Sequence, residues 1–417
     1  AFIGDGSQLT NLPTPSVNYS DITNTPLSYN ENGTGIQTPY TLASGGNSFA
    51  VGGSTQASGE SSTAMGQDTK AIGSASTAMG YNTTASGDFS TAMGYFTTAS
   101  GDYSTAMGNG TTASGFVSTA MGAQTVAIGN YSTAMGYGTT ASGDASTAMG
   151  DYTTASGYAS TASGQGTTAS GNYSTALGIN TTATKQGSFA VGADTVADGL
   201  ESSALGRGSI ASGNYSTAMG LQTTAIGDYS TAIGKGTKAS GPYSTAMGLG
   251  ANASGSTSTA MGGYTSAQDY GTTAIGLFNK TKETPKPNQY SLQNTAFVIG
   301  NGVSDNRSNA LEVLFDGTTT IAGDLNINSD ARLKANIISL GATLSKLLQI
   351  DGKTYTMKKD ANHKKKIGLL AQDIEKVFPE LVTETNDIKS VNYQGLVPVL
   401  INAMKEQQDE IDSYKTE

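Results

Sequence analysis

The stretch Ser104-Thr105-Ala106-Met107-Gly108, two variable residues, Thr111-Thr112-Ala113-Ser114-Gly115 and two more variable residues make up one unit of a fourteen-residue period. The period runs from Ala50 to Gly276 without an insertion or a deletion. Its apolar slot is filled in turn by Val51, Met65, Met79, Met93, Met107, Met121, Met135, Met149, Ser163, Leu177, Val191, Leu205, Met219, Ile233, Met247, Met261 and Ile275. A constant period of this length indicates stacked units that each contact mainly their neighbours.

Each unit divides into two halves, A-M-G and A-S-G, and a glycine closes each half. Glycine tolerates the positive φ that a sharp corner requires. The few residues between corners are too short for a helix and alternate in character, which predicts short strands. Neighbours in a strand point to opposite faces. We therefore expect Ala106 and Ala113 inside the coil between two thin sheets, with Met107 facing outward from one sheet and Ser114 from the other.

The outward apolar slot, called here the Met column, is too long to remain in water without a partner. A homotrimer around a common axis would cover it. The axial residues would include Met65, Met79, Met93, Met107, Met121, Met135, Met149, Met219, Met247 and Met261. A second interpretation places the methionines inside the coil, as is usual for buried methionine. The small Ala and Ser side chains leave little room there, so we favour the trimer axis.

The repeat resembles the head of YadA-like trimeric autotransporter adhesins, whose units read S-x-A-x-G-x-x-x-x-A-x-G. The resemblance covers residues 50–276. It implies a mainly β fold, a left-handed parallel β-roll trimer that binds surfaces. At the usual strand spacing the seventeen units would span about 80 Å.

Composition and charge limit the partners. The 417 residues include 55 Gly and no Cys, which fits an extracellular protein without disulfides. Residues 329–417 carry 13 basic and 13 acidic side chains, and residues 1–328 carry 9 and 19, so residues 1–328 hold the whole net charge of −10. This charge argues against nucleic acid and anionic lipid as ligands.

The sequence shows no membrane span and no secretory signal. It starts at Ala1 in mid-pattern, so we expect the chain to be a processed or truncated piece of a longer protein.

The sequence predicts four segments: a β-rich connector (1–43), the β-roll (44–278), a β-rich neck (279–328) and an α+β domain (329–417). In the last, 330–348 has a helical pattern, and strands are expected near 353–358 and 364–370. Apolar spacings of three and four near the end predict a coiled-coil helix. The predicted seam consists of Val397, Leu400, Met404, Gln407, Ile411 and Tyr414.

Aromatic residues recur four positions before the Met column. They are Phe89, Tyr103, Tyr131, Tyr173, Tyr215, Tyr229 and Tyr243. They would either stack on sugars of a receptor or pack rung on rung, and we favour packing because repetition alone produces columns of like residues.

Two other functions of the repeat are not favoured. Ice binding would need a regular array of threonine hydroxyls, but neighbouring Thr residues point to opposite faces, so only one hydroxyl of each Thr-Thr pair would join the array. Asp88, Asp102, Asp144 and Asp228 look irregularly placed and the G-G-x-G-x-D calcium motif is absent, so we predict no metal and no cofactor.

A second resemblance rests on Ser329-Asp330-Ala-Arg332-Leu333-Lys334, on 367–382 and on Val391-Asn-Tyr393. These residues resemble the endosialidase-type intramolecular chaperone domain of phage tail fibres. The resemblance implies that the domain assembles the trimer and then cuts the chain between Asn328 and Ser329. Ser329 would be the nucleophile and Lys334 its base. Without this family, Ser329-Asp330 would be an ordinary helix N-cap and Lys334 a surface residue.

Lysine takes a proton from serine only when it is itself neutral, which requires desolvation or a nearby positive charge, such as that of Arg332.

The combined patterns predict a homotrimeric phage tail fibre, located on the virion, that attaches to a receptor on the host surface. A glycan is one candidate for that receptor. The alternative is a trimeric adhesin on a bacterial surface. The membrane barrel of an autotransporter is missing from the sequence, which favours the phage. The only expected catalysis is self-cleavage, because no carboxylate cluster indicates a polysaccharide-cleaving enzyme.

Overall fold

The computed structural model describes residues 28–29, 36–37, 40–358 and 363–416. They form two compact units that divide between Gly323 and Asp324. The predicted connector lies largely outside the described residues. Of this segment, the structure describes β1 (Ser28–Tyr29), β2 (Ile36–Gln37) and β3 (Leu42–Ala43).

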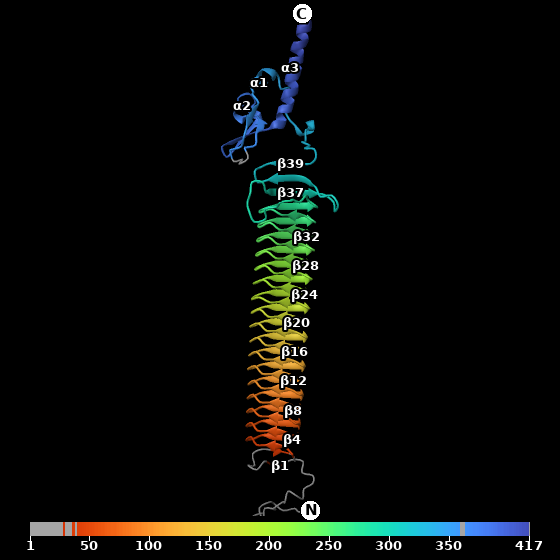
Figure 1. Ribbon diagram of the computed structural model, residues 1–417, viewed down its shortest axis with the longest axis vertical. Helices are drawn as coiled ribbons and strands as arrows, with labels where there is room; N and C mark the ends of the chain where they lie inside the picture. Colours follow the sequence, from red (N-terminus) through yellow and green to blue (C-terminus); the bar gives the residue numbers. More distant parts are fainter. Residues whose placement is uncertain (1–27, 30–35, 38–39, 359–362, 417) are drawn as a thin grey trace, which may run out of the picture. The chain divides into compact units, whose positions relative to one another are not determined.

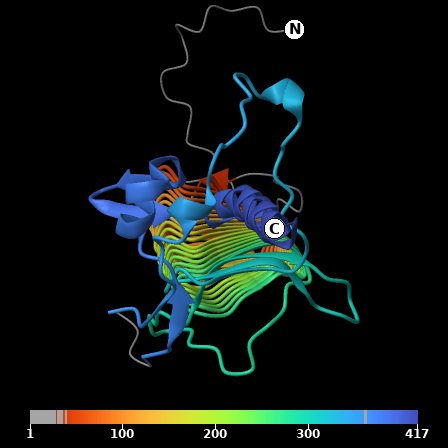
Figure 2. The ribbon, with the colours of Figure 1, turned by 90° about the horizontal axis from the view of Figure 1, so that it is seen from above.

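The first unit is a coil in which every turn, or rung, contributes one long and one short strand (Figure 1). In the repeat quoted above these are β12 (Thr105–Asn109) and β13 (Thr112–Ala113). Each strand pairs in parallel with its equivalent fourteen residues later, so Met107 lies opposite Met121 and Ala113 opposite Ala127. Viewed along the stack, the turns form a nested set of ribbons (Figure 2). The predicted mainly β solenoid with fourteen-residue turns is confirmed; the handedness stays a prediction.

Seventeen long strands form the first sheet. They are β4 (Phe49–Gly53), β6 (Thr63–Gln67), β8 (Thr77–Tyr81), β10 (Thr91–Tyr95), β12, β14 (Thr119–Ala123), β16 (Thr133–Tyr137), β18 (Thr147–Asp151), β20 (Thr161–Gln165), β22 (Thr175–Ile179), β24 (Phe189–Ala193), β26 (Ser203–Arg207), β28 (Thr217–Leu221), β30 (Thr231–Lys235), β32 (Thr245–Leu249), β34 (Thr259–Gly263) and β36 (Thr273–Leu277). The short strands form the second sheet. They are β3, β5 (Gln56–Ala57), β7 (Lys70–Ala71), β9 (Thr84–Ala85), β11 (Thr98–Ala99), β13, β15 (Val126–Ala127), β17 (Thr140–Ala141), β19 (Thr154–Ala155), β21 (Thr168–Ala169), β23 (Thr182–Ala183), β25 (Val196–Ala197), β27 (Ile210–Ala211), β29 (Thr224–Ala225), β31 (Lys238–Ala239), β33 (Asn252–Ala253) and β35 (Ser266–Ala267).

The space between the two sheets is filled by very small side chains. Ala106 and Ala113 are fully buried, and the same holds for their equivalents along the coil. Ser104 and Thr111 also point inward and are fully buried, whereas Thr105 and Met107 lie on the outer surface. The predicted placement of Ala is therefore confirmed, and the second interpretation, with methionine inside the coil, is wrong. Side chains of this size allow the two sheets to pack closely, which leaves no space for methionine.

The two glycines of each unit differ in backbone conformation, which the corner prediction did not distinguish. Gly108 has a φ of 125°, a conformation that L side chains rarely adopt. Gly101 and Gly115 are not in that region. A Cβ on Gly101 would lie 2.1 Å from the carbonyl oxygen of Gly115 in the next rung, and a Cβ on Gly108 would lie 1.9 Å from that of Gly122. Both glycines thus permit the close stacking of rungs, and the A-M-G glycine also supplies the positive φ.

The left-handed corner residue is the second one after each glycine and is usually not glycine. Tyr103 has a φ of 59° and Val117 a φ of 54°, and Phe96 occupies the other corner with a φ of 55°. A bulky residue in this region costs of order 1 kcal/mol unless its surroundings compensate. The aromatic residues therefore occupy strained corners, and their stacking on neighbouring rungs offsets that strain.

The acidic residues that looked irregular in the sequence share one position, directly after the A-S-G glycine, with several asparagines. Asp102 Oδ1 accepts a hydrogen bond from the Asp88 N–H (3.0 Å), and Asp144 Oδ1 accepts one from the Asn130 N–H (2.8 Å). Each carboxylate or amide satisfies a corner N–H of the preceding rung. The description of these Asp positions as irregular was wrong, because their separations are multiples of the period.

The first unit ends in three further strands. β37 (Thr295–Asn301) continues the first sheet in parallel with β36, whereas β38 (Asn309–Leu314) and β39 (Thr319–Ile321) add antiparallel pairs. The second sheet ends at β35, where the Asn279 side chain replaces a further strand. Its amide accepts a hydrogen bond from the Ser266 N–H (2.7 Å) and donates one to the Ser266 carbonyl (2.9 Å). This pairing leaves no sheet edge open at Ser266.

The second unit has short elements. They are η3 (Ala331–Leu333), α1 (Leu344–Leu347), β40 (Lys353–Tyr355), β41 (Lys366–Gly368), α2 (Ala371–Val377), η4 (Pro379–Leu381), β42 (Val382–Thr385), β43 (Ile388–Val391), η5 (Tyr393–Gly395) and α3 (Leu396–Thr416). β40 pairs with β41 and β42 with β43, both antiparallel. The predicted helix over 330–348 is wrong: only η3 and α1 are helical there. Ile374, Phe378 and Val399 form the core.

Candidate functional site

The predicted Ser-Lys pair is assembled by the short turn η3. Lys334 is the residue that ends the turn, and its N–H donates to the Ala331 carbonyl. The turn brings the two side chains together, and Lys334 Nζ donates a hydrogen bond to Ser329 Oγ at 2.7 Å. This is the contact that a base needs in order to receive the serine proton. Both side chains are solvent-exposed in the single chain.

Arg332 does not act as expected beside this pair. Its guanidinium forms an ion pair with Asp330 (Nη2 to Oδ2, 2.6 Å), and Asp330 also accepts from the Arg332 N–H as the N-cap of η3. These hydrogen bonds lower the pKa of Asp330 and raise that of Arg332. The carboxylate of Asp330 therefore offsets the charge of Arg332. Desolvation remains as the way to a neutral lysine, and the exposed position in one chain does not supply it.

The Met column lies on the outer surface of the first unit. Successive members pair directly in the long-strand sheet, and Met65, Met219, Met247 and Met261 are more than a third exposed. Ser163 occupies the column between Met149 and Leu177. The column is thus an unbroken row with one polar member, as the sequence predicts.

Helix α3 has two different faces. Leu396, Val399 and Ala403 are buried against the second unit. Glu406 continues that face, and its carboxylate accepts hydrogen bonds from the N–H groups of Thr343 (2.6 Å) and Leu344 (3.0 Å) at the start of α1. The predicted coiled-coil residues lie on the exposed side of the helix. They are Val397, Leu400, Met404, Ile411 and Tyr414, each more than two fifths exposed.

The aromatic corner residues stack along the rod. Phe89 and Tyr103 lie 5.0 Å apart with an interplanar angle of 7°, and Tyr229 and Tyr243 lie 5.0 Å apart at 1°. Packing of ring on ring is therefore confirmed as a structural role. The rings also remain about half exposed, so packing does not use up their whole surface.

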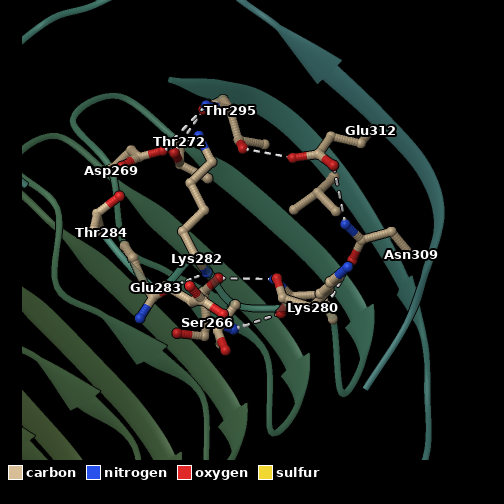
Figure 3. A pocket seen from close by; sticks show the side chains of 14 residues that line it. Ser266, Asp269, Thr272, Lys280, Lys282, Glu283, Thr284, Thr295, Asn309 and Glu312 are labelled. Atoms are coloured by element: carbon tan, nitrogen blue, oxygen red, sulfur yellow. Dashed lines mark hydrogen bonds and ion pairs between the residues drawn. The ribbon is translucent and has the colours of Figure 1, made fainter. Parts of the chain in front are cut away.

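A polar cavity of about 440 Å³ lies at the end of the second sheet, above β35 (Figure 3). Asp269 is almost fully buried beside it and pairs with Lys282 Nζ at 2.5 Å. Burial by itself would raise the pKa of Asp269, but the Lys282 ammonium and the N–H groups of Lys286 and Thr295 outweigh it and lower the pKa. Glu312 on the opposite side accepts from the Thr295 hydroxyl (2.8 Å). Asp269 stands where every other unit except that of Lys185 has glycine, and together with Asn279 it closes the coil.

Comparison with known proteins agrees with both patterns. The YadA head domain repeat matches in twelve segments, some of them overlapping, between residues 43 and 279, and together they cover more than half of the chain. The chain belongs to the YadA head repeat family. The chaperone of endosialidase family matches residues 329–383, which include Ser329 and Lys334.

The chain also has relatives among phage proteins. It is 33% identical over 102 residues to the long tail fiber protein Gp37 of Salmonella phage S16, covering 22% of this chain and 14% of that protein. It is 32% identical over 119 residues to Gp37 of Enterobacteria phages M1 and Ox2, covering 25% of this chain and 47% of each relative. The chain matches less than half of the length of these relatives. None of the described helices is long and apolar enough to cross a membrane.

Three residues with clear roles escaped the sequence analysis. Asn279 and Asp269 are single residues that break the period, and a break of that kind was the available signal. Glu406 gave no such signal, because its partners at Thr343 and Leu344 are more than sixty residues away in the sequence.

Proposed function

We propose that this chain is the receptor-binding part of a phage tail fibre that forms a homotrimer and attaches to a bacterial surface. The similarity to Gp37 tail fibre proteins combined with the YadA head repeats is the observation that carries this proposal. Tail fibre and YadA-like families are trimeric and bind host surfaces in general. In this chain, trimer formation would bury the Met column and the exposed face of α3, the two long apolar surfaces of a single copy.

The second unit would serve assembly. Rungs that look alike can pair out of register, and parallel pairing of distant segments is slow. A trimeric contact through α3 would align three chains before the coils stack. Once the Ser329–Lys334 pair is shielded from water, it would cut the chain after Asn328, which makes the assembly hard to reverse.

Two measurements test the proposal. Light scattering of the full chain is expected to give the mass of three copies, and a well-folded monomer would contradict it. Purified fibre is expected to bind intact host bacteria and to compete with phage adsorption. The alternative, an adhesin of a bacterial surface, keeps the trimer but predicts that the protein is found on bacterial cells and not in virions.

A further inference from the structure

The longest run of parallel aromatic rings contains Tyr215, Tyr229 and Tyr243. Tyr215 and Tyr229 lie 4.9 Å apart with an interplanar angle of 9°, and Tyr229 and Tyr243 lie 5.0 Å apart at 1°. Rings this close and this parallel cover one another's faces. Both faces of Tyr229 are therefore occupied, and no ligand can stack on it. A ligand can stack only where the run ends.

The run has two ends: Tyr215, which follows the corner of Glu201, and Tyr243, which is the more exposed of the two. The equivalent corner of the next rung is Thr257, whose N–H donates to the Pro242 carbonyl (2.8 Å), and the corner after that is Gly271, whose N–H donates to the Ser256 carbonyl (2.9 Å). Neither position carries a ring. Tyr243 is 60% exposed, against 50% for Tyr229. The face of Tyr243 that points toward Thr257 is thus open, bordered by a small side chain.

Along this corner column, the next ring after Tyr243 is that of Phe315, which reaches the Gly271 corner from the end of β38. A Cβ placed on Gly271 would lie 3.1 Å from Phe315 Cζ and 3.9 Å from the Thr257 hydroxyl oxygen. Phe315 in turn contacts Tyr290, with ring centroids 5.2 Å apart. The ring of Phe315 thus lies at the Gly271 corner, one rung beyond Thr257.

The Tyr243 ring face and the Thr257 hydroxyl together suit the binding of a sugar ring. The face of a tyrosine accepts the C–H face of a pyranose, and a hydroxyl beside it serves the hydroxyls at the sugar's rim. The Thr257 hydroxyl is exposed and donates to the Ser256 carbonyl (2.7 Å), so its lone pairs remain available as acceptors. With 9 basic and 19 acidic residues, the region 1–328 repels anionic sugars and nucleotides.

We propose that the open face of Tyr243, beside Thr257, binds a neutral hexose unit of a bacterial surface saccharide. This inference rests on the proposed attachment function and names its ligand class. Within the run, Tyr229 then has a structural role and Tyr243 a binding role, although both occupy the same corner position with the same backbone conformation, φ 58° and 57°.

Matched variants of the full chain separate the two roles. The probe is a set of neutral oligosaccharides released from enterobacterial lipopolysaccharide, measured by saturation-transfer NMR and calorimetry. Tyr243→Ala is expected to weaken binding at least tenfold, and Tyr243→Phe less than threefold. Tyr229→Ala is expected to change binding less than twofold but to lower the melting temperature more than Tyr243→Ala does, because it removes two ring contacts instead of one.

A third variant blocks the face without removing the ring. Thr257 has the same left-handed conformation as the tyrosines (φ 55°), so Thr257→Tyr extends the run by one ring. The added ring covers the open face of Tyr243, and Phe315 at the Gly271 corner lies next to the added ring, so this variant is expected to abolish saccharide binding while the melting temperature is unchanged or raised. Equal loss for Tyr229→Ala and Tyr243→Ala, or full binding by Thr257→Tyr, would overturn the proposal.

The same experiments distinguish this inference from the proposed function. Fibre that binds whole bacteria but none of the oligosaccharides refutes the saccharide site and leaves attachment intact. Binding to whole bacteria that is lost after protease treatment of the cells has the same meaning. Fibre that binds neither bacteria nor oligosaccharides refutes the attachment function itself.

Discussion

The two units reach a stable fold by opposite means. In the repeating units of the coil, the interior is filled by alanine, serine and threonine, and each rung repeats the hydrogen bonds of the one before. In the second unit, a small core around Ile374, Phe378 and Val399 joins segments that are far apart in the sequence. The coil therefore depends on the backbone and tolerates variation at its surface, whereas the second unit depends on a few particular side chains. Both leave one long apolar face uncovered in a single chain.

The largest effect is expected in the second unit. Ser329→Ala or Lys334→Ala should abolish the cut after Asn328, because the 2.7 Å contact between the two side chains is then lost. A denaturing gel of wild-type trimer should show two bands, the smaller one corresponding to the 89 residues 329–417. Arg332→Gln is the matched control and should still cut, since Arg332 is engaged by Asp330. A single full-length band from folded wild-type trimer would mean that Ser329 is not a nucleophile.

The next effect concerns the close stacking of the coil. Gly101→Ala should destabilise the rod by about 3 kcal/mol per chain, because the added methyl would lie 2.1 Å from a carbonyl oxygen of the next rung. Thermal melting followed by circular dichroism measures the change. Gly110→Asn is the control: Gly110 has a φ of 64°, and Asn82 takes the equivalent corner with a φ of 51°. Unchanged melting of Gly101→Ala would show that the rungs can separate without cost.

A smaller effect tests the trimer axis. Ser163→Met should stabilise the rod by about 1 kcal/mol per chain if the Met column is dry and roomy. Thr161→Met in the same strand also faces outward but lies outside the column, so it should not raise the melting temperature. If Ser163→Met leaves melting unchanged, the column is hydrated and the three chains do not meet there.

The smallest effect is a dependence on pH in the second unit. The N–H groups of Leu344 and Thr343 lower the pKa of Glu406 below its ordinary 4.5. A depressed folded pKa contributes stability that is complete above pH 4.5 and is lost as the pH falls through the folded value. The helical circular dichroism signal, which comes from this unit, should therefore decline in acid. Glu406→Gln should flatten that decline, and an identical acid profile for both proteins would argue against this contact.

The sequence by itself determined the period, the inward position of alanine, the outward Met column and the stacking of equivalent residues. These follow from local alternation and repetition, which read directly along the chain. The pairing of Ser329 with Lys334 was also predicted, from the resemblance of residues 329–334 to the chaperone family and not from their spacing.

Only the tertiary structure decided the rest. Tyr103 at a strained corner, Asp102 bound to the backbone of the preceding rung and the open ring face of Tyr243 all depend on what lies one rung away. Asn279 acts as a substitute strand because the second sheet ends at Ser266, and Glu406 faces inward because α1 happens to start beside it. Such roles arise from contacts between residues distant in the sequence, and a side chain's own identity does not say which neighbour the fold will bring to it.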